Sequence, residues 1–375
     1  MAITIPLPGQ PGAVRVCEAN AVLKNRGGRF DMTSGAKETA NQSFGCSHWL
    51  FIMAAQDRIL TSRKAADMST LTPERTELYE FDVHKNAARV SSQDFEVRAL
   101  DAALGAEIIG IDLGRPLNAA DLRRVHQAHL DHHVVVFRDQ HITPEQHIDF
   151  SRHFGRLMIH VLHQFHLQNH PEILIVSNVL KDDKPIGLGD AGKYWHSDIS
   201  YKPLPSLGSL LHAQELPAEG GDTLFANMHV AYDTLPAYLR EAIEGRRAAH
   251  SYLAKYGQMQ KEANWRPTLS PEQLAQVEEV IHPVVRTHPE TGRKALFVSE
   301  GFTTRIEGLA EDESREVLDA LFAHSVRPEH IYRHSWKPKD LVFWDNRSLI
   351  HLAAGCPAHL RRTLYRTTIE GDVPF

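Results

Sequence analysis

Three residues of the chain have side chains and a spacing that suit a bound metal ion. His196 and Asp198 stand two positions apart in a stretch that reads as extended, so in a strand both side chains would lie on one face. A third ligand must come from elsewhere, and the candidate is His351. Two histidines and one carboxylate form the facial triad of non-haem Fe(II) oxygenases, which leaves positions open for substrates. The set contains no thiolate, which argues against a structural zinc site.

The segments around these residues are predicted to be mostly strands. Strand-like segments recur at residues 97–113, 134–137, 173–176, 209–215, 223–225, 284–286, 295–298, 330–336, 341–344 and 363–369, and a turn at residues 289–292 makes 284–286 and 295–298 a hairpin. Helical spacing or capping signals predict helices at residues 118–133, 143–154, 230–243 and 311–324, and from Ser270 onward. Ligands so far apart in sequence can meet only if the sheet folds back on itself, as in a jelly roll or cupin-like barrel. We therefore expect a mainly β fold with flanking helices.

The composition is typical of a soluble enzyme in a reducing compartment. The 375 residues are 42% hydrophobic and 23% charged, which is enough for a large core. The net charge is -6 and the sequence has no basic runs, so it does not indicate a nucleic-acid-binding surface. No apolar stretch approaches the roughly 20 residues that a membrane span requires. The three cysteines are widely spaced and predict no disulfide framework, so we expect a cytoplasmic location and neither a nucleic-acid nor a membrane partner.

The first 67 residues differ from the rest of the chain. They contain eight Lys or Arg against five Asp or Glu, and they show no sustained helical or strand period. We expect residues 1–67 to be a disordered extension, either a transit-like segment or a stretch upstream of a translation start at Met68. No linker or internal repeat follows, so residues 68–375 are expected to form one domain.

Five motifs follow one another in residues 95–375. They are Trp195-His196-Ser197-Asp198, Gly220-Gly221-Asp222-Thr223, His282-Pro283-Val284-Val285-Arg286-Thr287-His288-Pro289, Gly301-Phe302-Thr303-Thr304-Arg305-Ile306, and Trp344-Asp345-Asn346-Arg347 with His351. In this order they resemble the taurine dioxygenase family of Fe(II)- and 2-oxoglutarate-dependent oxygenases, which includes the 2,4-dichlorophenoxyacetate and alkylsulfatase dioxygenases. The resemblance implies a double-stranded β-helix in residues 68–375, Fe(II) as the metal, 2-oxoglutarate and dioxygen as cosubstrates, and release of succinate and carbon dioxide.

Three arginines follow His351 on one predicted strand, at Arg361, Arg362 and Arg366. A guanidinium suits a carboxylate because it can donate two parallel hydrogen bonds. The resemblance implies that Arg362 binds the distal carboxylate of 2-oxoglutarate, that Thr223 adds a hydrogen bond to it, and that Arg366 lies in the substrate pocket. Their even offset would place Arg362 and Arg366 on the same strand face, whereas we expect Arg361 to be solvated.

By the same resemblance, His160, His163 and Phe302 line the substrate pocket. This chain departs from the family pattern at three places. It has His163 where the family enzyme has a tyrosine, Gly192 where it has an asparagine, and Lys255-Tyr256 where it has a serine and a phenylalanine. These departures argue against taurine itself. Arg366 still favours a small organic anion, which is a sulfonate, a sulfate ester or a carboxylate.

Three functions fit these residues. The first is a 2-oxoglutarate-dependent dioxygenase that hydroxylates a small organic anion, with C–S or C–O cleavage where the new hydroxyl makes the carbon unstable. The alternative is a non-oxidative metal protein of the cupin type, an isomerase or a ligand-binding module, which would not need Arg362. The third is a catalytically silent barrel that serves as a subunit, and the complete ligand set argues against it. A homo-oligomer is compatible with each of the three.

Overall fold

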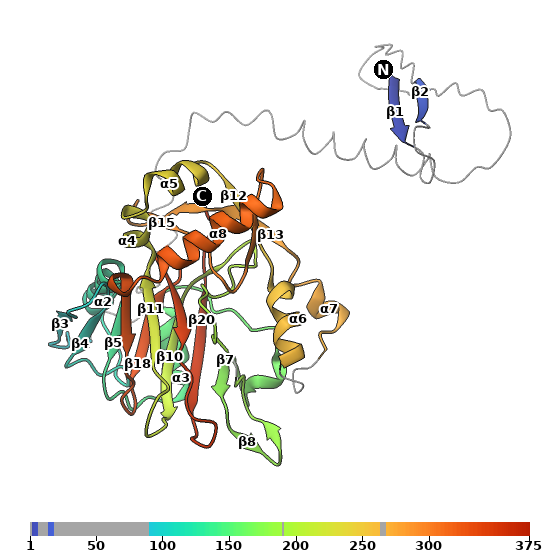
Figure 1. Ribbon diagram of the computed structural model, residues 1–375. Helices are drawn as coiled ribbons and strands as arrows, with labels where there is room; N and C mark the ends of the chain where they lie inside the picture. Colours follow the sequence, from blue (N-terminus) through green and yellow to red (C-terminus); the bar gives the residue numbers. More distant parts are fainter. Residues whose placement is uncertain (1, 7–13, 19–89, 190, 263–267) are drawn as a thin grey trace, which may run out of the picture. The chain divides into compact units, whose positions relative to one another are not determined.

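The computed structural model describes residues 2–6, 14–18, 90–189, 191–262 and 268–375 (Figure 1). The chain separates into two compact units, residues 1–73 and 74–375, and each is described by itself. In the first unit β1 (Ala2–Pro6) pairs antiparallel with β2 (Val14–Glu18). The rest of the extension predicted for residues 1–67 lies outside the described residues, so its boundary at Met68 stays a prediction.

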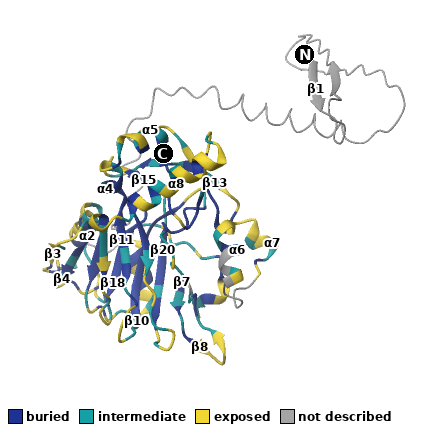
Figure 2. Cartoon of the chain, viewed as in Figure 1, coloured by how far each residue is buried: buried dark blue, intermediate teal, exposed yellow. Residues whose placement is uncertain are grey.

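The second unit is built on a sheet of eight strands. In spatial order these are β3 (Glu96–Ala99), β4 (Ala106–Ile109), β5 (Val134–Phe137), β18 (Leu341–Asp345), β10 (Ser206–Glu215), β20 (Thr363–Glu370), β7 (His170–Ser177) and β6 (His166–Leu167). Neighbouring strands are antiparallel except β4 and β5, which are parallel. Every residue of β5 and β18 is buried, as expected for strands covered on both faces (Figure 2).

A second, three-stranded sheet carries one of the candidate metal ligands. Its antiparallel strands are β17 (Ile331–His334), β11 (Thr223–Asn227) and β19 (Leu349–Ala353), in that order. One hydrophobic cluster contains Val136 and Trp344 from the large sheet together with Phe225 and Leu349 from the small one. The two sheets therefore pack on each other through a shared core. The ring of His351 on β19 contacts this core, with its centroid 4.8 Å from that of Trp344.

Helices and smaller sheets surround these two sheets. The helices are α2 (Ala119–His132), α3 (Pro144–Arg152), α4 (Met228–Asp233), α5 (Ala237–Ile243), α6 (Tyr252–Glu262), α7 (Pro271–Leu274) and α8 (Glu311–Ser325), with short 3-10 turns η3 (His163–Phe165) and η4 (Pro328–His330). The remaining strands are β8 (Leu180–Lys181), β9 (Lys184–Pro185), β12 (Arg247–His250), β13 (Val280–Pro283), β14 (Val285–Thr287), β15 (Lys294–Leu296) and β16 (Thr303–Ile306). Leu122 of α2 and Phe150 of α3 pack with Phe343 on the large sheet. Among the described helices, not one has the length and apolar character that crossing a bilayer demands.

The prediction of a mainly β chain with few helices is confirmed. Capping boxes form at Thr143 and Ser270, where the sequence predicts helix starts. The single helix predicted for residues 230–243 is wrong, because the chain breaks into α4 and α5 with Pro236 before the second helix. Proline lacks the N–H that a continuous helix would need at this point.

Candidate active site

His196, Asp198 and His351 lie together in the structure, and all three are buried. One potential ligand atom from each lies within 4.8 Å of the other two. Nε2 of His196 is 3.6 Å from Oδ1 of Asp198, and Nε2 of His351 is 3.9 Å from Oδ2 of Asp198. The three residues that sequence spacing singles out therefore converge from distant parts of the chain.

The backbone at His196 differs from the extended strand that the sequence predicts. His196 and His351 form an isolated antiparallel bridge, in which each backbone N–H donates to the carbonyl of the other residue, at 3.1 and 2.8 Å. The chain then turns at Asp198, and Ile199 has a φ of 60°. The prediction of a strand through Asp198 is wrong. Instead, the bridge fixes His196 against β19, and the turn directs Asp198 back toward both histidines.

The protonation of these residues suits a cation. Nδ1 of His196 donates to the carbonyl of Tyr194 at 2.9 Å, so the lone pair is on Nε2. Burial, together with the nearby His196, holds the pKa of His351 well below its usual value and keeps this imidazole neutral. Burial alone would raise the pKa of Asp198, but the guanidinium of Arg366 holds it well below its usual range. Two imidazoles and one carboxylate are donors that fit a divalent metal ion.

Two side chains from the large sheet contact the carboxylate of Asp198. Ser209 of β10 donates its hydroxyl hydrogen to Oδ2 at 2.7 Å, and Arg366 of β20 donates from Nη1 to Oδ1 at 3.0 Å. Sequence analysis missed Ser209, although a serine within an otherwise apolar, fully buried strand segment is a usable signal. Arg366, which the sequence predicts to be in the substrate pocket, lines that pocket and also pairs with the candidate metal ligand.

The candidate 2-oxoglutarate residues both lie near Trp336. Arg362 is 9% exposed, and its guanidinium carbon is 6.0 Å from the centre of the Trp336 ring. Thr223 accepts a hydrogen bond from Nε1 of Trp336 at 3.0 Å. Burial lowers the pKa of Arg362 to about 10, and its Nε has no hydrogen-bond partner. No carboxylate of the described residues forms an ion pair with this guanidinium, so the site holds a buried cation that fits an anionic ligand.

A pocket of about 450 Å³ opens beside the candidate metal ligands. It is lined by His160, Leu188, Ala191, Gly192, Tyr194, His196, Asp198, Ile199, Tyr201, Tyr252, Phe302 and Arg366. Of the residues predicted to line it, His160, Phe302 and Arg366 do so. His163 is exposed on η3, where its ring packs against His166, and the structure does not bring it to the pocket. Gly192 has a φ of 74°, and a Cβ there would lie 3.0 Å from Cε1 of His196, which explains glycine at this position.

Comparison with known proteins identifies the family. Residues 96–368 match the family described as "Taurine catabolism dioxygenase TauD, TfdA family". The chain belongs to this family. The resemblance inferred from the five sequence motifs is therefore confirmed, and the candidate ligands all fall within the matched TauD/TfdA segment.

Characterised relatives cover most of that segment. The pentalenolactone F synthase of Streptomyces arenae is 33% identical over 282 residues, which is 73% of this chain and 94% of the relative. The (S)-phenoxypropionate/alpha-ketoglutarate-dioxygenase of Sphingobium herbicidovorans is 34% identical over 293 residues, 75% of this chain and 96% of the relative. Among solved structures, a taurine dioxygenase from Burkholderia xenovorans is 35% identical, with a TM-score of 0.62 over 75% of this chain and 90% of that one.

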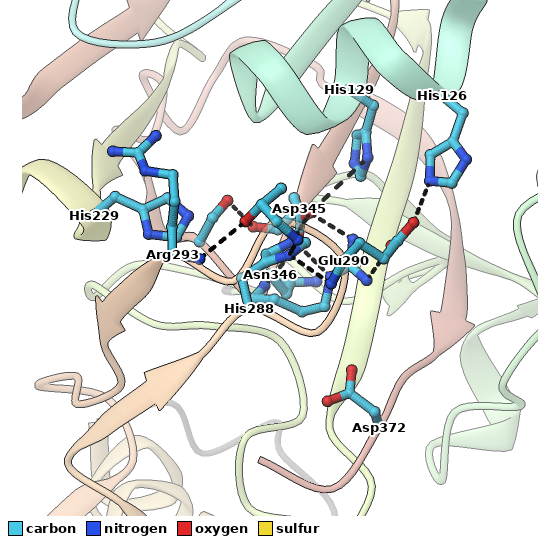
Figure 3. A network of polar contacts seen from close by, with 12 residues as sticks. His126, His129, His229, His288, Glu290, Arg293, Asp345, Asn346 and Asp372 are labelled. Atoms are coloured by element: carbon cyan, nitrogen blue, oxygen red, sulfur yellow. Dashed lines mark hydrogen bonds and ion pairs between the residues drawn. The ribbon is translucent and has the colours of Figure 1, made fainter. Parts of the chain in front are cut away.

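A buried network of charges supports the active site of this TauD/TfdA protein. Asn346 accepts a hydrogen bond from the backbone N–H of Asp198 at 3.2 Å, and its carbonyl accepts one from the Ser197 hydroxyl at 2.8 Å. The adjacent Asp345 accepts from Nε and Nη2 of Arg347 at 2.9 and 2.7 Å, and from Nε2 of His288 at 3.0 Å. Figure 3 shows His288, Glu290 and Asn346 around Asp345, beneath the helix that carries His126 and His129. The network fixes the loop that holds Asp198.

Removing the charge of Asp345 should destabilise the fold strongly. In Asp345→Asn the buried Arg347 loses a two-pronged ion pair and keeps only its contact with Glu290, at 2.6 Å. Breaking a buried pair typically costs about 3 to 5 kcal/mol, so we expect the free energy of unfolding to fall by about 3 kcal/mol in urea titrations. Asp319→Asn, which removes an exposed ion pair on α8, is the matched control and should change it by less than about 0.5 kcal/mol. An equal effect of the two substitutions would contradict this account.

Proposed function

We propose that the protein is an Fe(II)- and 2-oxoglutarate-dependent dioxygenase that hydroxylates a small organic anion, a sulfonate, a sulfate ester or a carboxylate. The observation that carries the proposal is the buried guanidinium of Arg362, which forms no ion pair with any described residue, in a chain whose His196, Asp198 and His351 converge. A non-oxidative cupin-type protein would not bind 2-oxoglutarate and would not need this guanidinium. The proposal includes a double-stranded β-helix for the two packed sheets and, from the three scattered cysteines, a cytoplasmic location.

Each residue has a defined task in this proposal. His196, Asp198 and His351 hold the metal ion, and Ser209 orients the carboxylate. The bound metal with 2-oxoglutarate and dioxygen supplies an oxidant for a C–H bond, while 2-oxoglutarate leaves as succinate and carbon dioxide. Arg362 and Thr223 bind the distal carboxylate of 2-oxoglutarate. Arg366 anchors the organic anion, and the apolar wall that includes Leu188 and Phe302 excludes water from the reacting carbon.

The proposed function is tested by product release. The purified protein, reconstituted with Fe(II), is incubated with 2-oxoglutarate and dioxygen together with alkanesulfonates, alkyl sulfate esters or aryloxyalkanoates. We expect at least one of these anions to increase succinate formation well above the rate without organic substrate. If the protein binds Fe(II) but consumes no 2-oxoglutarate with any of them, the non-oxidative alternative is favoured.

The cosubstrate assignment predicts a specific effect of Arg362→Lys. Lysine keeps the positive charge but cannot donate two parallel hydrogen bonds to one carboxylate. We expect the apparent affinity for 2-oxoglutarate to fall more than tenfold, which corresponds to roughly 1.4 kcal/mol or more. Arg361→Lys is the control one residue earlier, because Arg361 is exposed and pairs with Glu215. The affinity is measured by calorimetry. An unchanged affinity for 2-oxoglutarate in Arg362→Lys would contradict the assignment of Arg362 to the 2-oxoglutarate carboxylate.

A further inference from the structure

Tyr201 is a buried residue of the pocket, and its hydroxyl makes no hydrogen bond to the described part of the chain. The residue is 4% exposed and lines the pocket beside Asp198 and Arg366. Its hydroxyl has no hydrogen-bond partner among the described residues. This oxygen is not among the fully enclosed side-chain atoms that lack a partner, so it is accessible from the pocket. A tyrosine hydroxyl in a largely buried residue usually has a hydrogen-bond partner. This hydroxyl is therefore suited to contact a molecule that enters the pocket.

The ring of Tyr201 is held firmly in place. Its centroid is 4.7 Å from that of Tyr252 and 4.9 Å from that of Phe302, which meets it edge to face. The residue follows the turn that positions Asp198, and the N–H of Lys202 closes that turn on the carbonyl of Ile199 at 3.0 Å. Because two aromatic neighbours and a closed turn restrict it, the side chain cannot readily rotate to find another acceptor.

The surroundings define what the hydroxyl can do. Burial, with the nearby phenol of Tyr252, raises the pKa of Tyr201 well above its usual value, so the group stays a donor. Both oxygens of Asp198 already accept hydrogen bonds, from Ser209 and Arg366. Neither oxygen of Asp198 accepts from Tyr201, so a ligand in the pocket can supply the acceptor, and Arg366 on the same pocket lining favours an anionic one.

We propose that Tyr201 is a specificity-determining residue whose hydroxyl donates a hydrogen bond to the anionic group of the organic substrate, next to Arg366. This inference rests on the proposed function and adds a donor to the same site. It assigns the polar end of the pocket to Arg366 and Tyr201 together, and it leaves the rings of Tyr252 and Phe302 to contact the apolar body of the substrate.

The test compares the native protein with Tyr201→Phe and uses two anions and one neutral amide. Binding of 2-phenoxypropionate, of its neutral amide 2-phenoxypropionamide and of hexyl sulfate is measured by calorimetry without oxygen, on protein loaded with Fe(II) and 2-oxoglutarate. We expect Tyr201→Phe to weaken binding of whichever anion binds the native protein by about tenfold, as for a hydrogen bond to a charged group. The same substitution should change amide binding less than twofold, and the affinity for 2-oxoglutarate should not change.

Two controls separate this role from a structural one. Tyr201→Phe removes a hydroxyl that has no partner, so its melting temperature should equal or exceed that of the native protein. Tyr365→Phe removes the same hydroxyl from a residue of β20 outside the pocket, and it should change the binding of neither the anion nor the amide. Equal losses for the anion and the amide, or a lowered melting temperature, would overturn the proposal. Failure of both anions to bind the native protein would also overturn the proposal. The proposed function, in contrast, fails only if 2-oxoglutarate is not consumed.

Discussion

His351→Ala is expected to lower the affinity for Fe(II) by more than a hundredfold and to abolish turnover while the fold persists. The substitution removes one of three ligands, and replacing even a residue that only supports a ligand typically costs 10- to 100-fold in metal affinity. The imidazole also makes no side-chain hydrogen bond to the rest of the described protein, since its Nδ1 is unpartnered and its Nε2 lies 3.9 Å from Asp198. Truncation therefore affects the ion far more than the surrounding structure.

The metal affinity is measured by anaerobic equilibrium dialysis, and the fold is checked by circular dichroism and the melting temperature. His359→Ala is the matched control, because His359 is an exposed residue of the loop between β19 and β20. It should bind the metal and turn over as the native protein does. Near-native Fe(II) binding and turnover in His351→Ala would show that the ligand set is wrong.

Acidification is expected to unfold the protein between about pH 6 and pH 4. Burial lowers the pKa of His129, His133, His147 and His250 to about 3 in the folded state. In the unfolded chain these imidazoles bind a proton below roughly pH 6.5. The unfolded state thus holds more protons over this range, so the free energy of unfolding decreases as the pH falls. At roughly 1.4 kcal/mol per pH unit for each group, four groups remove about 10 kcal/mol by pH 4.5, comparable with the stability of a whole domain.

Urea unfolding at a series of pH values between 7.5 and 5 measures this slope directly. Replacing one buried imidazole by a group that does not titrate, as in His250→Gln, should reduce the proton uptake on unfolding by about one. His141→Gln is the control, because the side chain of His141 is exposed. A stability that stays constant from pH 7 to pH 5 would contradict the prediction.

Sequence predicts those parts of the site whose chemistry is local. His196 and Asp198 are two residues apart, so their types and spacing indicate a metal site. The four-residue offset of Arg362 and Arg366 indicates a shared strand face, whereas the ligand of each comes from the family resemblance. The convergence of His351 on the other two needed only the premise that the sheet folds back. The family motifs carried Thr223, which is bonded to Trp336 close to Arg362.

Other features depend on three-dimensional contacts that no spacing encodes. Ser209 reaches Asp198 because the turn at Asp198 brings this carboxylate to β10 of the large sheet. Tyr201 stands out only once its hydroxyl is found without a partner inside the pocket. His163 matches a pocket position of the family but belongs to a short 3-10 turn that carries it to the surface.

The place of β20 in the large sheet has a consequence for how the chain reaches this structure. Synthesis proceeds from the N-terminus, so β7 and β10 exist before β20, which lies between them and pairs with both. During that interval the first eight residues of β10, buried in the final structure, have an unpaired edge that can join to other chains. Contacts so distant in sequence also form slowly. The nascent chain is therefore most exposed to aggregation just before Arg362 and Arg366 are synthesised. These two residues, which we propose to bind the cosubstrate and the substrate, enter the fold in the same step that closes the sheet.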